Sequence, residues 1–105
     1  MISIGENMYT IKVSNIMQGT DFPTSGKILY SIISSKIDDE DTIVLDMSDV
    51  PLIPSMFLNT SIGRIITERG AEFLKSKITF QNIRASDAAR IKDYVKRMSG
   101  NSCAN

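Results

Sequence analysis

The sequence predicts a single α/β domain with a mostly parallel central sheet of about four strands and alternating helices. Three observations carry this prediction. The chain has 105 residues, which is the length of one ordinary domain. It is 42% hydrophobic and 23% charged, a globular composition that excludes disordered, collagenous and coiled-coil chains. Segments with a strand-like period of two alternate with segments of helical period, an order typical of parallel sheets joined by helices.

The N-terminal part predicts a strand, a loop and a helix. Residues 8–16 alternate apolar and polar side chains and include β-branched residues, which predicts a strand. Residues 19–25 combine Gly and Pro with small polar residues and predict a loop. A helix is then expected from Ser25, with Ser25 or Thr24 capping its open amides. Its apolar residues fall on one helical face: Ile28, Leu29, Ile32, Ile33 and Ile37.

The middle of the chain predicts a buried strand followed by a stiff turn. Residues 42–48 (TIVLDMS) form a short apolar run between polar segments, as expected of a central strand in a parallel sheet. The next segment, DVPLIPS, contains Pro51 and Pro54, which fix their own φ angles and prevent the strand from continuing. This segment therefore predicts a rigid turn.

The second half predicts two helices around a third strand. One helix begins with Ser55 as a suitable N-cap and stops at Gly70. The strand covers residues 77–83. Ser86 opens the last helix, which is expected to end at Gly100. The apolar faces of the two helices are Leu58, Ile62, Ile65 and Ile66, and Ala88, Ile91, Val95 and Met98.

These elements define one domain over residues 1–99. Met1–Ile4 are the candidate for an additional edge strand. Residues 100–105 are polar and small, and we expect them to form a disordered C-terminal tail.

The residue inventory excludes most enzyme classes. The sequence has no His and one Cys, Cys103. A Ser-His-Asp or Cys-His arrangement is therefore impossible, as are an internal disulfide and a Cys-based zinc site. The remaining carboxylates, lysines and hydroxyl groups show no pairing typical of catalysis. We therefore expect no enzymatic activity, no metal centre and no cofactor.

The charge balance argues against nucleic-acid and membrane partners. Twelve basic and twelve acidic residues give a formal net charge of zero, so bulk attraction to a polyanion or an anionic membrane is absent. Arg90, Lys92, Lys96 and Arg97 lack an accompanying aromatic pattern and are interpreted as a solvated helix face. The N-terminus has no secretory signal, and no apolar run approaches the roughly 20 residues of a membrane span. We expect a cytoplasmic protein.

Two other segments fail as ligand motifs. Residues 19–27 (GTDFPTSGK) have six residues between their glycines, whereas a phosphate loop has four, and no Ser or Thr follows Lys27. The acidic run 38–41 lacks the spacing and central Gly of a calcium-binding loop and is interpreted as a solvated turn.

Asp46 and Ser55 are the two individual residues that could bind a ligand or be modified. Asp46 ends the central strand, at the sheet edge where open α/β proteins bind ligands, and together with Asp49 it could hold Mg²⁺. Its alternative role is to accept hydrogen bonds from amides of the turn. Ser55 lies at a helix start, where a phosphoserine would act as a charge switch; its alternative role is that of an ordinary N-cap.

The segment from Ile43 to Arg64 (IVLDMSDVPLIPSMFLNTSIGR) resembles the signature of STAS domains: an aliphatic strand, a turn with Ser, then a helix. It is most similar to the small bacterial STAS-like domains of unknown function, in which a Ser-rich turn precedes Phe and Leu at the helix start. Ser55, Phe57 and Leu58 match those positions. The resemblance extends over roughly residues 8–98.

This resemblance implies a non-enzymatic regulatory module related to anti-sigma-factor antagonists. Such domains bind a GHKL-type ATPase, serine kinase or other sigma-factor regulator through the turn and the helix around the signature Ser. On this chain the implied partner-binding residues lie within 49–59. They are Asp49, Pro54, Ser55, Met56, Phe57 and Asn59.

The chain departs from the signature at its centre. Pro54 stands where antagonists have Asp, Ser55 matches the first Ser, and Met56 replaces the usual phospho-acceptor Ser. Ser55 is therefore the candidate acceptor, with Ser48 as a second. The alternative function is a small-ligand or nucleotide-binding domain that uses the sheet edge near Asp46.

Overall fold

Three short parallel strands form the sheet, in the order β1-β2-β3. A computed structural model describes residues 8–39 and 42–103, the last four of these by their backbone only. The strands are β1 (Met8–Lys12), β2 (Thr42–Asp46) and β3 (Ile78–Gln81). The helices are α1 (Val13–Met17), α2 (Phe22–Lys36), α3 (Ser55–Thr60), α4 (Ile62–Arg69), α5 (Ala71–Lys77) and α6 (Ala85–Cys103). The predicted α/β class and parallel sheet are confirmed. The described residues contribute three strands where the sequence predicts about four, and Met1–Ile4 lies outside them.

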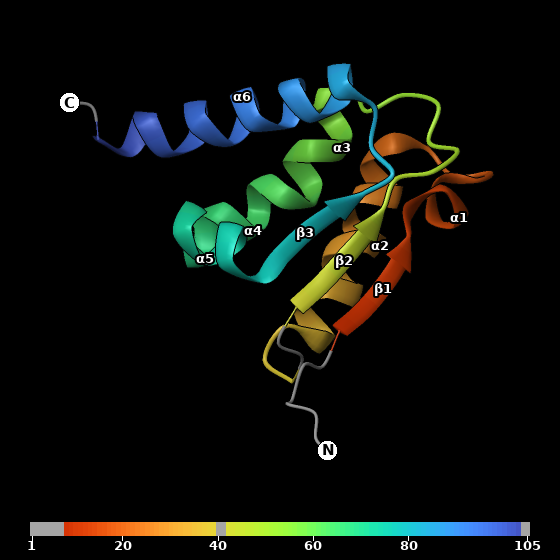
Figure 1. Cartoon of the computed structure of the whole chain (residues 1–105), viewed down its shortest axis with the longest axis horizontal. Coiled ribbons are helices and arrows are strands. Elements are labelled where there is room, and N and C mark those ends of the chain that lie inside the picture. The colour runs from red at the N-terminus through yellow and green to blue at the C-terminus, as the bar shows by residue number, and fades with distance from the viewer. Residues whose placement is uncertain (1–7, 40–41, 104–105) are drawn as a thin grey trace.

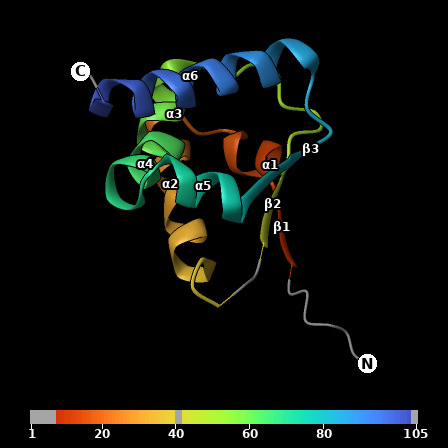
Figure 2. The same cartoon turned by 60° about the vertical axis from the view of Figure 1, so that its left-hand side comes forward.

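The helices lie on one side of the sheet, as Figure 2 shows with the strands seen nearly edge-on. The register places Tyr9 beside Ile43 and Ile43 beside Ile78, so that these side chains share the helix-covered face. The opposite face carries Thr10 and Thr79, which are both exposed, and between them Val44, which is buried. Sequential parallel strands joined by right-handed crossovers place all their connecting helices on the same side, which explains the one-sided arrangement (Figure 1).

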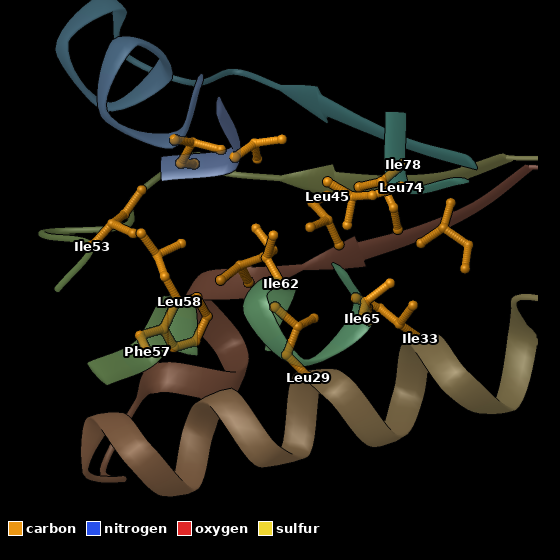
Figure 3. Packing of buried hydrophobic residues seen from close by; sticks show 14 of the residues in the cluster. Leu29, Ile33, Leu45, Ile53, Phe57, Leu58, Ile62, Ile65, Leu74 and Ile78 are labelled. Atoms are coloured by element: carbon orange, nitrogen blue, oxygen red, sulfur yellow. The ribbon is translucent and has the colours of Figure 1, made fainter. Parts of the chain in front are cut away.

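The core fills the space between this face and the helices. Figure 3 shows Leu29 and Ile33 of α2 facing the strands, with Ile62 and Ile65 of α4 between them. Phe57 is the largest of the fully buried side chains, with 1% of its surface exposed. No helix in the described part of the chain is long and apolar enough to cross a membrane.

The first strand and helix have different boundaries from those predicted. β1 ends at Lys12, and residues 13–17 form the short helix α1 rather than the end of a strand. Helix α2 begins at Phe22, three residues before the predicted start, because Asp21 is its N-cap and accepts a 2.8 Å hydrogen bond from Thr24 N. Pro23 fits within this first turn, where no amide donor is needed. The hydroxyl of Ser25 instead donates to the carbonyls of Asp21 and Phe22, at the N-cap and the first residue of the helix.

The single helix predicted from Ser55 to Gly70 is divided into α3 and α4. Ser61 interrupts it with φ −119° and ψ −88°, while its buried hydroxyl donates a 2.7 Å hydrogen bond to Phe57 O. Pro54, not Ser55, occupies the N-cap position of α3, and it makes no side-chain cap. Gly70 ends α4 with φ 93°, as predicted, but the chain then forms α5, which the apolar pattern did not predict.

The C-terminal elements also shift. β3 covers only four residues of the predicted strand 77–83. Helix α6 begins at Ala85 and continues through Gly100 to Cys103. It therefore extends into the predicted tail of residues 100–105, of which Ala104 and Asn105 lie outside the described residues.

Helices α2 and α3 approach closely at Gly26, which has no side chain to hold them apart. A Cβ at this position would lie 1.8 Å from Thr60 Oγ1 and 2.7 Å from Phe57 O. The second of these atoms belongs to the backbone, so rotation of a side chain cannot relieve the overlap.

Gly26→Ala should therefore lower the free energy of unfolding by about 1–3 kcal/mol, because overpacking outweighs the roughly 1 kcal/mol that Ala gains over Gly inside a helix. Ser34→Ala, at an exposed position of the same helix, is the matched control and should change it by less than about 0.5 kcal/mol. Urea unfolding measures both variants. A Gly26→Ala protein more stable than the wild type would contradict the close approach.

Candidate functional site

The turn between β2 and α3, residues 47–54, lies at the carboxyl edge of the sheet. Because all three strands are parallel, the ends of β1 and β3 meet it there, together with the start of α6 (Figure 1). This edge is where open α/β folds place their sites. Side chains from each of these neighbouring segments contact the turn.

Asp46, the last residue of β2, holds the start of the turn. Its Oδ1 accepts hydrogen bonds from Ser48 N at 3.0 Å and from Asn82 Nδ2 at 2.9 Å. The hydrogen bond from Asn82 is the main reason that the pKa of Asp46 falls from 3.8 to about 2, and the bonds from Ser48 add to it. The turn-capping role considered for Asp46 is therefore what the structure shows.

Lys12, the last residue of β1, contacts the next two residues of the turn. Its Nζ donates to Ser48 Oγ at 2.9 Å and forms an ion pair with Asp49 Oδ2 at 3.4 Å. Asp49 adopts φ 63°, a conformation that Asp tolerates better than most residues. The turn is thus attached to β1 as well as to β3.

Arg84, just before α6, holds the second half of the turn. Its Nη2 donates to Val50 O at 3.0 Å and to Pro51 O at 3.1 Å. Its Nε donates at 2.8 Å to Asp87, which is itself buried. The guanidinium therefore satisfies two turn carbonyls and one carboxylate together, a geometry for which Arg is suited.

These contacts leave two large apolar side chains pointing outward. Val50 and Ile53 are buried, whereas Leu52 and Met56 are 49% and 55% exposed. Among the described residues, only Met8 and Ile28 are also large, apolar and exposed. We call Pro51, Leu52, Ser55 and Met56, which are all exposed, the turn surface.

The residues predicted to bind a partner do not all reach this surface. Asp49, Ser55 and Met56 are exposed, and Pro54 is partly buried at the N-cap of α3. Asn59 is exposed and accepts a 2.7 Å hydrogen bond from Tyr94.

The sequence predicts Phe57 on the docking surface, and the structure corrects this prediction. Phe57 directly follows the exposed Met56 in α3, but its side chain is buried in the hydrophobic core. Its buried ring anchors α3 in the core beneath the turn surface.

The carboxylates of Asp46 and Asp49, which the sequence suggests as an alternative Mg²⁺ pair, each have a partner within the protein. Asp46 Oδ1 already accepts two hydrogen bonds, and the ammonium group of Lys12 lies beside Asp49. Within residues 8–39 and 42–103, no three His, Cys, Asp or Glu side chains form a potential metal-binding group. The small-ligand alternative near Asp46 is therefore centred on a carboxylate that is already engaged.

Sequence reasoning missed the three side chains that hold the turn: Lys12, Asn82 and Arg84. The sequence held a signal for Asn82 and Arg84, because Asn82 is the second-last residue of the predicted strand 77–83 and Arg84 directly follows it, and the carboxyl ends of parallel strands meet at one edge. Lys12 lies in the middle of the strand predicted for residues 8–16, so the sequence did not indicate that it ends a strand.

The comparisons with known proteins identify a family. The family described as a STAS-like domain of unknown function matches residues 25–88, which is more than half of the chain. The matched segment begins inside α2, continues through β2, the turn, the helices α3 to α5 and β3, and ends in the first turn of α6. No curated protein and no solved structure matches the chain.

The hydrogen bond between Asp46 and Asn82 predicts a specific acid sensitivity. Because the pKa of Asp46 is lower in the folded protein than in the unfolded chain, its stabilising contribution is complete above pH 3.8 and is lost as the pH falls toward about 2. Asp46→Asn should remove this part of the pH dependence. Urea unfolding at about pH 6 and about pH 2.5 measures the difference.

Asn82→Gly provides the second arm of the experiment, since Gly accepts the φ of 56° at this position and removes the donor. It should reduce the same pH dependence, and the double variant should show no further reduction. An Asp46→Asn protein with the full acid sensitivity of the wild type would show that this hydrogen bond is not responsible.

Proposed function

The chain belongs to the family of STAS-like domains of unknown function, and from this premise we propose that it is a regulatory module that acts by binding a protein partner rather than by catalysis. Partner binding would use the segment 49–59, with the turn surface at its centre. The observation that carries the proposal is the exposure of Leu52 in the turn and of Met56 at the start of α3. The turn beneath them is held by Lys12 through two of its side chains, by Arg84 through two of its carbonyls, and by Asn82 through Asp46 at the end of β2.

Exposed apolar side chains on a fixed backbone favour binding for two reasons. Covering the exposed halves of Leu52 and Met56 would contribute about 1 kcal/mol each, from removal of apolar surface from water. The turn is already ordered by Lys12, Asn82 and Arg84, so little conformational entropy is lost on association. Met56 adds a flexible, polarisable contact that adapts to a partner surface.

The partner class follows from the STAS resemblance of the sequence. We propose a GHKL-type ATPase with serine kinase activity, or another regulator of a sigma factor. The charge asymmetry of the chain supports a protein partner, since residues 1–53 carry a formal charge of −5 and residues 54–105 a charge of +5. Such a distribution orients a charged partner during encounter without favouring polyanions in general.

Ser55 is the proposed phospho-acceptor. It lies in the turn surface, and among the described contacts its hydroxyl makes no hydrogen bond that would have to be broken before reaction. A phosphate group beside Met56 would place about two negative charges in the apolar contact and weaken the complex. Ser48 is less suitable, because Lys12 donates to its oxygen.

Met56→Arg and Leu52→Arg should each weaken binding to a GHKL-type ATPase partner by at least about tenfold, since each buries a charge in the contact. Met8→Arg is the matched control: Met8 is 54% exposed but lies at the opposite end of the sheet, and its replacement should change the affinity by less than about twofold. Isothermal titration calorimetry measures the three variants. Unchanged affinity for both turn variants would reject this surface.

Incubation with the same ATPase and ATP should add one phosphate to the wild-type chain and none to Ser55→Ala. Mass spectrometry of the intact chain measures the modification, and Ser48→Ala serves as the control that keeps it. Phosphorylation of Ser55→Ala to the wild-type extent would show that Ser55 is not the acceptor. The docking surface would still be tested separately by Met56→Arg and Leu52→Arg.

A further inference from the structure

A second surface of the molecule is an apolar groove beside α6. The groove has a volume of about 680 Å³ and lies between α5, β3 and α6. Figure 1 shows α6 running above α5 and β3. The groove shares no residue with the segment 49–59, so it is independent of the proposed function.

Aliphatic and aromatic side chains form the floor of the groove. Leu74, Ile78, Ile91 and Val95 are buried members of the core cluster, and Phe80 is partly buried above them. The floor is therefore a continuation of the core, and the apolar surface that it exposes belongs mainly to the partly buried residues Phe80, Ile83 and Ala88.

Lysines line both walls of the groove. Lys75 of α5 stands on one side, and Lys92 and Lys96 of α6 stand on the other, one helical turn apart. Lys75 has only a long 3.9 Å ion pair with the exposed Glu72. Lys92 and Lys96 form no ion pair with any of the described residues, and no acidic side chain is among those that line the groove. The groove therefore presents uncompensated positive charge along its length.

The shape of the groove indicates what could occupy it. The lining residues of α6 run from Ala88 to Ser99, which corresponds to roughly 16 Å, or three turns of helix. Cations placed on both walls require an occupant with several negative charges along its length. A fatty acid or similar amphiphile carries one charged end, so it matches this distribution less well.

We propose that the groove binds an acidic amphipathic helix of a partner protein, about eleven or twelve residues long. Its apolar stripe would lie on the floor formed by Ile78, Phe80, Ile91 and Val95, as in other helix-in-groove interfaces. Its flanking carboxylates would pair with Lys75 on one wall and with Lys92 and Lys96 on the other.

A pair of synthetic peptides tests the proposal on the full chain. Both are fluorescein-labelled twelve-residue helices with the same Leu stripe; one has Glu on both flanks and the other has Lys at those positions. Fluorescence anisotropy should show that the acidic peptide binds at least about tenfold more tightly than the basic peptide. Amide NMR shifts should change at the groove residues and not in the turn surface.

Charge-reversed variants locate the interaction. Lys92→Glu with Lys96→Glu should weaken the acidic peptide at least about tenfold and strengthen the basic one. The matched control, Lys27→Glu with Arg90→Glu, changes the net charge equally at exposed positions outside the groove and should alter either affinity by less than about twofold.

Three results would overturn the proposal. The first is no binding of the acidic peptide at concentrations up to about 1 mM. The second is an equal loss of affinity in the control variant, which would indicate bulk charge attraction only. The third is binding of dodecanoate in the groove without binding of the acidic peptide, which would assign the groove to a small anionic amphiphile.

Discussion

The attachment of one turn to three separate segments is the constraint on which the rest of the structure depends. Lys12, Asn82 and Arg84 come from the end of β1, from just after β3 and from just before α6. Lys12 and Arg84 bind residues that follow β2, and Asn82 binds Asp46, the last residue of β2. Parallel topology makes this possible because it brings the carboxyl ends of all strands to one edge. The carbonyls of Val50 and Pro51 and the carboxylate of Asp46 then have partners, which lowers the cost of reversing the chain direction at a partly buried position.

The same constraint separates the buried from the exposed side chains of the turn. With Val50 and Pro51 held through their carbonyls, Val50 and Ile53 enter the core while Leu52 remains outside. Helix α3 then begins with Met56 outward and Phe57 inward. The close approach at Gly26 fixes α3 against α2, and the interruption at Ser61 turns the chain so that α4 can cover the sheet. The turn surface is thus a consequence of how the core is closed.

The sequence predicts the order of the elements well because hydrophobic period and turn residues are local signals. β2, the division at Gly70 and the α/β class follow from such patterns, and the family match agrees with the STAS resemblance carried by the segment from Ile43 to Arg64. The interruption at Ser61 is not local, since the apolar spacing continues through it and only packing decides where the helix bends. The outward position of Met56 beside a buried Phe57 likewise depends on the location of α2.

The hydrogen bonds that hold the turn could not be predicted, because they join residues that are far apart in the sequence. Lys12 and Ser48 are 36 positions apart, as are Asp46 and Asn82, so their hydrogen bonds depend on strand register rather than on local spacing. Asp46 and Ser55 were identified as residues of interest, but whether each served as a cap or as a ligand-binding group was undecided from spacing alone. The structure answers this for Asp46 through its hydrogen bonds, and it places Ser55 at the start of α3 without a capping bond.

The central claim is that the turn is ordered before any partner binds. The most direct test is ¹⁵N relaxation of the free, full-length chain, compared between wild type and Arg84→Lys, which keeps the charge but not the planar set of donors. The account predicts order parameters of about 0.85 for the amides of residues 48–53 in the wild type, as in rigid backbone, and a clear decrease near Val50 and Leu52 in Arg84→Lys. Wild-type values below about 0.6 in this segment would contradict it, because the turn would then be flexible in the free protein.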